Sequence, residues 1–255
     1  MPCVPHPCEP LFMNPSVWMR KRSTSYLLTL VAPFVRSHYR SMVSAGDLVF
    51  DVGANVGDLT QVFSDLGAYV IAIEPQPSCA QILKTRFRAH RNVLVLETAL
   101  SDSVGSADLI ISQDYHTTST LSERWMSGGR FKNRFSDDRR LTRVAVNTTT
   151  LDGLISQYGR PRFCKIDVEG FEYRVLKGLS AGIPCISFEF VSEFLDEAQR
   201  CMNHLNTLGT VRYNYSPFIL YRLRSRTWLS STELMNRLSR YSSFFLSGDI
   251  YARLM

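Results

Sequence analysis

The segment VFDVGANVG, residues 49–57, combines an acidic residue with two glycines where a short apolar strand is expected to end. Asp51 stands at the end of that strand, and Gly53 and Gly57 bound the turn that follows. Glycines let the backbone adopt positive φ and approach a ligand closely. The helix expected over 58–66 would present free amide donors at the same place. Such a turn is typical of a site that holds a nucleotide-like cofactor at the carboxyl end of a parallel strand.

The residues inside the turn favour one cofactor class over another. A dinucleotide site requires G-x-G-x-x-G, and here Asn55 stands where the second glycine would be, which leaves little room for a pyrophosphate. Asp51 also suits a cationic ligand that carries an amino group. Both features favour S-adenosylmethionine over NAD. Taken alone, the turn also fits an ordinary tight turn of an α/β protein.

A second candidate contact to the cofactor is Glu74, at the end of the next expected strand, 69–73. In a doubly wound sheet that strand end lies beside the glycine turn, so the carboxylate can accept both ribose hydroxyls of an adenosyl group. The alternative is a surface acid before the proline turn at Pro75. Together with the glycine turn, cofactor binding is the favoured interpretation.

The segment KIDVEGFE, residues 165–172, again places acidic residues and a glycine after an apolar strand. Asp167 and Glu169 suit a loop that lines a pocket, where a carboxylate could take the proton of a hydroxyl that attacks a methyl group. These carboxylates could instead hold the ammonium or sulfonium end of the cofactor, or orient the substrate. Acids at strand ends are often only helix-start residues that suit the helix dipole.

Other titratable residues offer a separate base or a metal site. His116 is the best separate candidate for a base, because an unperturbed histidine pKa near ~6.5 suits proton abstraction. It opens an irregular polar stretch, and a loop histidine without a role is an equally good interpretation. Asp167, Glu169 and Glu189 all follow or end expected strands and could converge on a divalent ion. No His/Asp cluster has clear metal-ligand spacing, however, and no metal site is predicted.

The composition allows a sizeable core and bears on possible partners. The chain has 255 residues, of which 45% are hydrophobic, and a net charge of +6, which fits one domain with additions. The excess charge lies mainly in 124–143 and 211–255, without a dense Lys/Arg run. Scattered surface arginines are therefore the favoured interpretation, and no nucleic-acid partner is expected.

Cysteine usage and the N-terminal residues bear on the compartment. The six cysteines form no C-x-x-C pair, which indicates a reducing compartment with neither a disulfide framework nor a zinc site. Residues 1–15 are rich in proline and lack the apolar core of a signal peptide. The apolar stretch 26–35 is too short to cross a membrane. A cytoplasmic protein without a transmembrane segment is therefore expected.

Strands and helices alternate from residue 47 onward, which predicts an α/β fold with a doubly wound, mostly parallel sheet and helices on both faces. Closely spaced strands near the C-terminus indicate an antiparallel far edge. The expected strands are 48–52, 69–73, 93–98, 106–111, 144–149, 163–167, 185–190, 211–216, 218–223 and 250–254.

The organisation along the chain predicts three parts. Residues 1–45 are expected to form a tail and a helical cap, with a helix over 17–44. Residues 46–255 are expected to form the main domain. Within it, the polar stretch 112–143 lacks clean periodicity and is expected to be a lid-like insert.

Taken together, these motifs resemble the FkbM family of S-adenosylmethionine-dependent methyltransferases. The similarity runs from about residue 47 to 190, and the residues before and the region past 210 match only loosely. The segments that carry it are VFDVGANVG (49–57), AIEP (72–75), ETALSD (97–102), TTTLD (148–152), KIDVEGFEYRVLKG (165–178) and ISFEF (186–190).

The resemblance implies a Rossmann-like class I methyltransferase sheet of seven strands, mostly parallel, with the last strand antiparallel. It implies S-adenosyl-L-methionine as the cofactor, and Asp167 and Glu169 at the reaction centre. The residues implied to bind the cofactor are Asp51, Gly53, Ala54, Asn55 and Gly57 around its methionine part, Glu74 with Pro75 at the ribose, and Ala99, Leu100 and Ser101 near the adenine.

The predicted function is therefore an O-methyltransferase that acts on a hydroxyl of a sugar, a glycolipid or a polyketide-type natural product such as a macrolide. Two alternatives are a nicotinamide-dependent oxidoreductase on the same sheet and a non-catalytic module that binds nucleic acid. The missing middle glycine speaks against the first. The sequence does not choose among the acceptors and does not reveal the oligomeric state.

Overall fold

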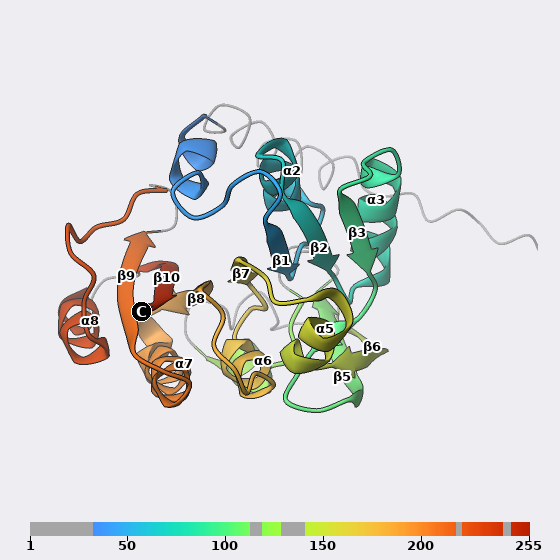
Figure 1. Ribbon diagram of the computed structural model, residues 1–255. Coiled ribbons are helices and arrows are strands. Elements are labelled where there is room, and N and C mark those ends of the chain that lie inside the picture. Colours follow the sequence, from blue (N-terminus) through green and yellow to red (C-terminus); the bar gives the residue numbers. More distant parts are fainter. Residues whose placement is uncertain (1–32, 113–118, 129–140, 218–220, 242–245) are drawn as a thin grey trace, which may run out of the picture.

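The computed structural model describes residues 33–112, 119–128, 141–217, 221–241 and 246–255 (Figure 1). Its main feature is a seven-stranded sheet in the order β3-β2-β1-β7-β8-β10-β9. The strands are β1 (Leu48–Val52), β2 (Tyr69–Ile73), β3 (Val93–Leu96), β7 (Phe163–Ile166), β8 (Cys185–Val191), β9 (Val211–Pro217) and β10 (Ser247–Leu254). β10 is antiparallel to both β8 and β9, and the other paired strands of this sheet are parallel. The predicted class I methyltransferase sheet, with its last strand antiparallel, is thereby confirmed.

Helices cover both faces of this sheet (Figure 1). They are α2 (Asp58–Asp65), α3 (Pro77–Phe87), α5 (Leu151–Tyr158), α6 (Glu172–Lys177), α7 (Leu195–Thr207) and α8 (Ser231–Leu238), with short 3-10 turns at Ser192–Phe194 and Ser239–Tyr241. Side chains of β1 alternate between two cores, as a strand requires. Val49 packs with Phe63 of α2, whereas Phe50 and Val52 pack in the core that α5, α6, α7 and α8 cover.

Local sequence explains where several of these elements begin. Ser230 and Glu233 form a capping box at the start of α8, because each side chain pairs with a backbone N–H of the other residue. The side chain of Thr150 accepts a hydrogen bond from the N–H of Gly153 and so caps α5. All four residues of β7 are buried, as expected for a central parallel strand with helices on both sides.

Two predicted strands do not belong to the main sheet. β5 (Gly105–Ser112) and β6 (Leu141–Thr149) pair with each other in antiparallel register, from Gly105 with Thr148 to Ser112 with Leu141. With the short β4 (Ala99–Leu100), they form a separate three-stranded sheet in the order β4-β6-β5. The expectation that they continue the doubly wound alternation is wrong, because β6 returns along β5 instead of crossing over to a parallel neighbour.

The pairing of β5 with β6 also bears on the predicted insert over 112–143. Its C-terminal residues 141–143 already belong to β6, and the described residues 119–128 contain the short helix α4 (Glu123–Ser127). Residues 221–223 are not a strand, so that part of the predicted strand 218–223 is wrong and the rest lies outside the described residues.

The described part of the predicted cap is a helix over 33–39, followed by turns to residue 46. Val35 and Tyr39 of this helix are buried against the core that contains Phe63. The division between a cap and a main domain at residue 45 stays a prediction. No helix within the described ranges has the length and apolar character needed to cross a bilayer.

Candidate active site

The carboxyl ends of β2, β1, β7 and β8 lie side by side at one edge of the sheet (Figure 1). Val52 of β1 pairs with Ile73 of β2 and with Ile166 of β7. The residues that follow these three strands therefore meet, as the sequence predicts for the glycine turn, Glu74 and Asp167. Ligands of open α/β sheets bind outside such strand ends.

Gly53 connects the glycine turn to the strands on both sides. The N–H groups of Gly53 and Ala54 donate hydrogen bonds to the carbonyl oxygen of Ile73, at 2.9 and 3.0 Å. Gly53 has a φ of 79°, and a Cβ atom at this residue would lie 1.8 Å from the carbonyl oxygen of Asp167. The close approach of two backbone segments therefore requires glycine here, and the turn touches the segment that carries the predicted base.

The carboxylate of Glu74 holds the turn at the end of β2. Its two oxygens accept hydrogen bonds from the N–H groups of Asn55 and Gln76, both at 2.8 Å. Burial raises the pKa of Glu74 to about 7, although these two bonds oppose the shift. A carboxylate has about four acceptor sites, so each oxygen of Glu74 retains one after these bonds.

Asp51 lies inside the sheet rather than at an open surface. Its side chain is buried and accepts a hydrogen bond from the hydroxyl of Thr60, with 2.5 Å between the two oxygens. Burial raises the pKa of Asp51 to about 6. Because Thr60 belongs to the first turn of α2, this bond ties the N-terminus of α2 to the end of β1.

Ala54 and Gly57 face α3. Ala54 packs in a small core with Ala72, Leu83 and Phe87. Gly57 has a φ of 88°, and a Cβ atom there would lie 2.5 Å from Cε2 of Phe87 and 2.6 Å from Cδ2 of Leu83. Ala54 and Gly57 thus form the side of the turn that packs on α3. A bulky side chain at position 57 would displace Leu83 and Phe87 of α3.

The substitution Gly57→Ala is expected to lower the free energy of unfolding by about 2–5 kcal/mol, the sum of left-handed strain and an overpacked core. Gly46→Ala is the matched control, because Gly46 has a φ of 85° and nothing within 4 Å of its Cβ position. The control should lose only about 1–2 kcal/mol, the cost of the left-handed backbone. Urea unfolding measures both, and equal losses would mean that α3 accommodates the methyl group without cost.

An ion triad around one buried lysine, absent from the sequence-based predictions, lies beside the acid segment. Lys165 of β7 is 1% exposed, and its Nζ lies 3.1 Å from Oδ2 of Asp167 and 3.0 Å from Oδ1 of Asp249 in β10. Burial alone would lower the pKa of Lys165, but the charges of Asp167 and Asp249 outweigh it and raise the pKa well above its ordinary value. The triad fixes Asp167 at the end of β7.

The triad continues into the helix over 33–39. The hydroxyl of Tyr251 lies 3.4 Å from Oδ2 of Asp249 and 2.8 Å from Nε2 of His38. Burial lowers the pKa of His38 to about 4, so its ring is neutral at pH 7. His38, to which the sequence assigns no role, thus links the helix over 33–39 to Tyr251 in β10.

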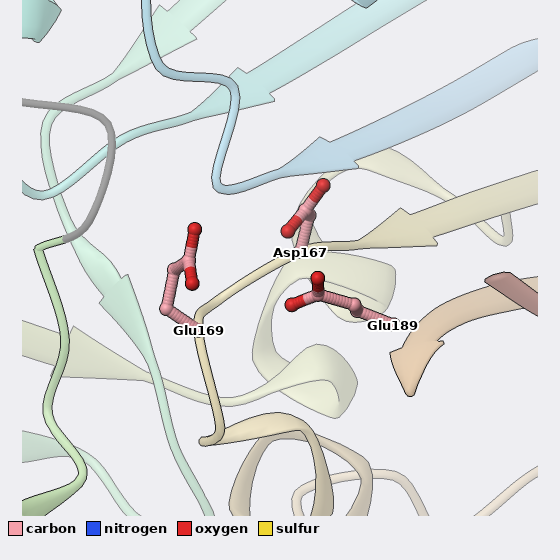
Figure 2. A group of neighbouring side chains, drawn as sticks. All are labelled: Asp167, Glu169 and Glu189. Atoms are coloured by element: carbon pink, nitrogen blue, oxygen red, sulfur yellow. The ribbon is translucent and has the colours of Figure 1, made fainter. Parts of the chain in front are cut away.

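Glu172 shapes the loop that carries Glu169. Its Oε1 accepts hydrogen bonds from the N–H groups of Val168 and Gly170, at 3.1 and 3.2 Å. Glu169 lies between them with a φ of 54°. Burial raises the pKa of Glu172 to about 7. The loop thus closes around the carboxylate of Glu172. Figure 2 shows that the side chains of Glu169 and Asp167 lie on the same side of this loop.

The described part of the insert covers this loop. The hydroxyl of Thr120 donates to the carbonyl oxygen of Glu169 at 2.6 Å. A Cβ atom at Gly170 would lie 2.5 Å from Cε3 of Trp125 in α4, which is buried against Phe194. These contacts support a lid-like role for the insert, which stays a prediction.

Three carboxylates come together at the sheet edge: those of Asp167, Glu169 and Glu189 (Figure 2). One oxygen of each lies within 4.8 Å of the others. Glu189 comes from β8, where it pairs in register with Asp249. Burial, followed by the charges of Glu169 and Asp167, raises the pKa of Glu189 well above its ordinary value. The edge of the sheet is therefore strongly acidic.

The remaining predicted site residues are His116, Pro75 and the segment 99–101. His116 lies outside the described residues. Ala99 and Leu100 form β4 and are buried in two hydrophobic cores, and the N–H of Ser101 donates to the carbonyl oxygen of Thr149 at 2.9 Å. Pro75 is half-buried after Glu74. Contacts of these residues with an adenine ring stay a prediction.

Sequence reasoning gave no role to Lys165, Thr60, Glu172 or Asp249. A lysine in the apolar run FCKI was a usable signal, because a fully buried lysine requires an acidic partner. Asp249 stands at the head of an alternating strand and could have been proposed as that partner. Nothing in the sequence pairs Thr60 with Asp51.

Comparison with known proteins places these features in a family. A profile of the methyltransferase FkbM domain matches residues 51–215. The chain is 27% identical over 152 residues to the hexuronic acid methyltransferase AglP of Haloferax volcanii, a match that covers 57% of this chain and 55% of AglP. The matched part thus spans about half the length of that relative.

Among solved structures, precorrin-6y C5,15-methyltransferase of Geobacter metallireducens has a TM-score of 0.43 at 13% identity, covering 87% of this chain and 86% of that one. The 23S rRNA methyltransferase ErmE has a TM-score of 0.46 at 12% identity, covering 88% and 68%. Similarity at this level is too weak to assign a function, so the assignment rests on the sequence match. That match spans more than half of the chain and includes the glycine turn, Glu74 and the acid segment, and the chain belongs to the FkbM-domain family of S-adenosyl-L-methionine-dependent methyltransferases.

Proposed function

We propose that this methyltransferase transfers a methyl group to a hydroxyl of a sugar, with glycolipids and polyketide-type products as further acceptor classes. The observation that carries the proposal is the contact between the glycine turn and the acid segment, where Gly53 lies against the backbone of Asp167. A donor held by the turn would lie next to carboxylates able to accept a proton, which supports the proposal. The hexuronic acid methyltransferase AglP, to which the chain is similar, supports a sugar as the acceptor.

The residues of the turn fit the donor S-adenosyl-L-methionine. Glu74 retains one free acceptor site on each oxygen, which suits the two hydroxyls of a ribose. Oε1 of Gln76 is buried without a hydrogen-bond partner in the described part of the chain, and it adds an acceptor beside Glu74. Gly53 and Asn55 provide the narrow turn over β1 for the methionine part.

The proposed reaction needs little beyond alignment and one base. The acceptor oxygen attacks the methyl carbon, a C–O bond forms, and the C–S bond breaks with its electrons retained by sulfur. When bound, the donor would supply the methyl group and leave as the neutral thioether of S-adenosylhomocysteine. Asp167, with Glu169 beside it, would accept the hydroxyl proton. Lys165 keeps Asp167 in place through the 3.1 Å ion pair. Holding the two substrates close and in line supplies most of the rate.

Because burial raises the pKa of Glu74 to about 7, binding of S-adenosylhomocysteine is expected to strengthen between pH 6 and pH 8. The ionised carboxylate is the better acceptor, so binding favours deprotonation, and affinity rises as the pH passes the pKa of Glu74, by up to about tenfold over this range. Calorimetric titration at the two pH values measures this. Glu74→Gln should bind about 10- to 100-fold more weakly, through loss of a charged acceptor, and with a flatter pH response. An unchanged pH response in Glu74→Gln would remove Glu74 from the cofactor site.

The acceptor is tested by release of S-adenosylhomocysteine against a panel of glycosides, glycolipids and polyketides, with hexuronic acid glycosides first. We expect release above background with a sugar hydroxyl, and mass spectrometry of the product should locate the new O-methyl group. A protein that binds S-adenosylhomocysteine but methylates no member of the panel would contradict the proposed acceptor class. Membership in a methyltransferase family disagrees with both sequence-based alternatives, an oxidoreductase and a non-catalytic module.

A further inference from the structure

We propose that Asp167, Glu169 and Glu189 bind one hard divalent cation, Mg²⁺ or Mn²⁺, at the reaction centre. One oxygen of each carboxylate lies within 4.8 Å of the others, and Figure 2 shows the three side chains grouped around one point. Oxygen ligands at about 2.1 Å from such an ion lie about 3–4 Å from each other. Small side-chain rotations are therefore enough to close the group around an ion.

The carboxylate of Glu189, which is half-buried and has one shielded oxygen, points independently to a ligand. Its Oε2 is shielded from solvent and has no hydrogen-bond partner in the described part of the chain. Nor does Glu189 form an ion pair with any described residue. A buried carboxylate oxygen without a partner costs free energy. A cation bound between Glu189, Asp167 and Glu169 would give this oxygen the partner it lacks.

The distribution of charge supports the same conclusion. Lys165 lies in ion-pair distance of Asp167, and its ammonium is shared between Asp167 and Asp249. Glu189 lies directly beside Asp249 in the sheet register. One positive charge thus serves two aspartates, and a further cation would supply the counter-charge that Glu189 lacks among the described residues.

The loop geometry holds the two ligands from the acid segment in place. The backbone bonds from Val168 and Gly170 to Glu172 fix the loop on either side of Glu169. The ion pair with Lys165 fixes Asp167. Glu189 projects from β8 and is held by its strand pairing. Three ligands on rigidly held backbone leave the other coordination positions of the ion open to water and substrate oxygens.

The role of the ion rests on the proposed function. A divalent cation lowers the pKa of a coordinated hydroxyl and orients it. It would also offset the repulsion between this acidic edge and an acidic sugar such as a hexuronic acid. The bonds that form and break remain those of the proposed methyl transfer.

The test is titration of Mn²⁺ into the full chain after removal of metals with a chelator, followed by electron paramagnetic resonance of free Mn²⁺. We expect the free signal to fall as one Mn²⁺ binds per chain, and excess Mg²⁺ to restore it. Glu189→Gln should weaken Mn²⁺ binding at least tenfold. The matched control is Glu97→Gln, which alters an exposed glutamate outside the group and should bind Mn²⁺ like the unaltered chain.

Binding of S-adenosylhomocysteine to Glu189→Gln verifies that this variant is folded. If the unaltered chain leaves the free Mn²⁺ signal unchanged, or if folded Glu189→Gln binds Mn²⁺ as tightly as the unaltered chain, the metal site is wrong. Because this measurement involves no methyl transfer, it is independent of the acceptor panel. Mn²⁺ binding with no methylated sugar would contradict only the proposed acceptor, and a methylated sugar without Mn²⁺ binding would contradict only the metal site.

Discussion

Replacement of Lys165 with methionine is expected to lower the free energy of unfolding by about 3–5 kcal/mol, because it leaves the carboxylate of Asp249, 20% exposed, without its counter-charge. Asp167 is 40% exposed, so water screens its charge and it contributes little to this loss. The ammonium of Lys165 lies 3.1 Å from Asp167 and 3.0 Å from Asp249, and its side chain is 2% exposed. Methionine keeps most of the side-chain volume, so the loss of stability reports the missing charge and not the creation of a cavity. Urea unfolding at pH 7 gives the value.

The matched control for Lys165→Met is Lys84→Met, because Lys84 pairs with Glu97 at 2.6 Å but is 44% exposed. An exposed pair contributes about 0–1 kcal/mol, so the control should lose little. The double variant Lys165→Met with Asp249→Asn should recover part of the stability lost by the single variant, because one uncompensated charge is gone. A single variant as stable as the control would show that the charge of Asp249 is compensated in another way.

The substitution Asp167→Asn is expected to lower kcat about 10²- to 10⁴-fold, the usual contribution of a positioned base. The affinity for S-adenosylhomocysteine should change only a few-fold, because the amide keeps the shape of the side chain and Lys165 retains Asp249 as a partner. Turnover with the acceptor found in the panel, and calorimetric titration of S-adenosylhomocysteine, give the two quantities.

Asp65→Asn serves as the control for Asp167→Asn, because Asp65 pairs with Arg36 at the surface, away from the strand ends. It should leave both turnover and affinity unchanged. Undiminished turnover in Asp167→Asn would exclude Asp167 as the base and leave Glu169 or His116. A loss of cofactor affinity as large as the loss of turnover would assign Asp167 to donor binding instead.

The strands of the main sheet were predictable because local pattern and burial agree. β1 and β2 have the predicted bounds. Buried parallel strands are short apolar runs bounded by turn residues, and this signal is contained in a few consecutive residues. The glycine turn and Glu74 follow from the same local signal, because the residue after each strand lies at the ligand-binding edge.

The small sheet was not predictable in the same way. β5 has the alternation of an ordinary strand, and only its pairing with β6, across residues 113–140, separates it from the main sheet. Pairing partners are chosen by contacts between residues far apart in the chain, which a local pattern does not contain. The role of Gly57 is a similar case, because its required lack of a side chain comes from Phe87 and Leu83 in α3.

The sequence by itself determined the fold class, the bounds of several main strands, the edge that carries the site and the candidate residues at that edge, because each of these follows from short-range pattern. Only the tertiary structure decided how the charges are arranged there. It gave Lys165 two carboxylate partners, one of them 84 residues away in β10, and it brought Glu189 to Asp167 and Glu169. Electrostatic interactions act through space and not along the chain, and their strength depends on burial that the completed sheet alone creates.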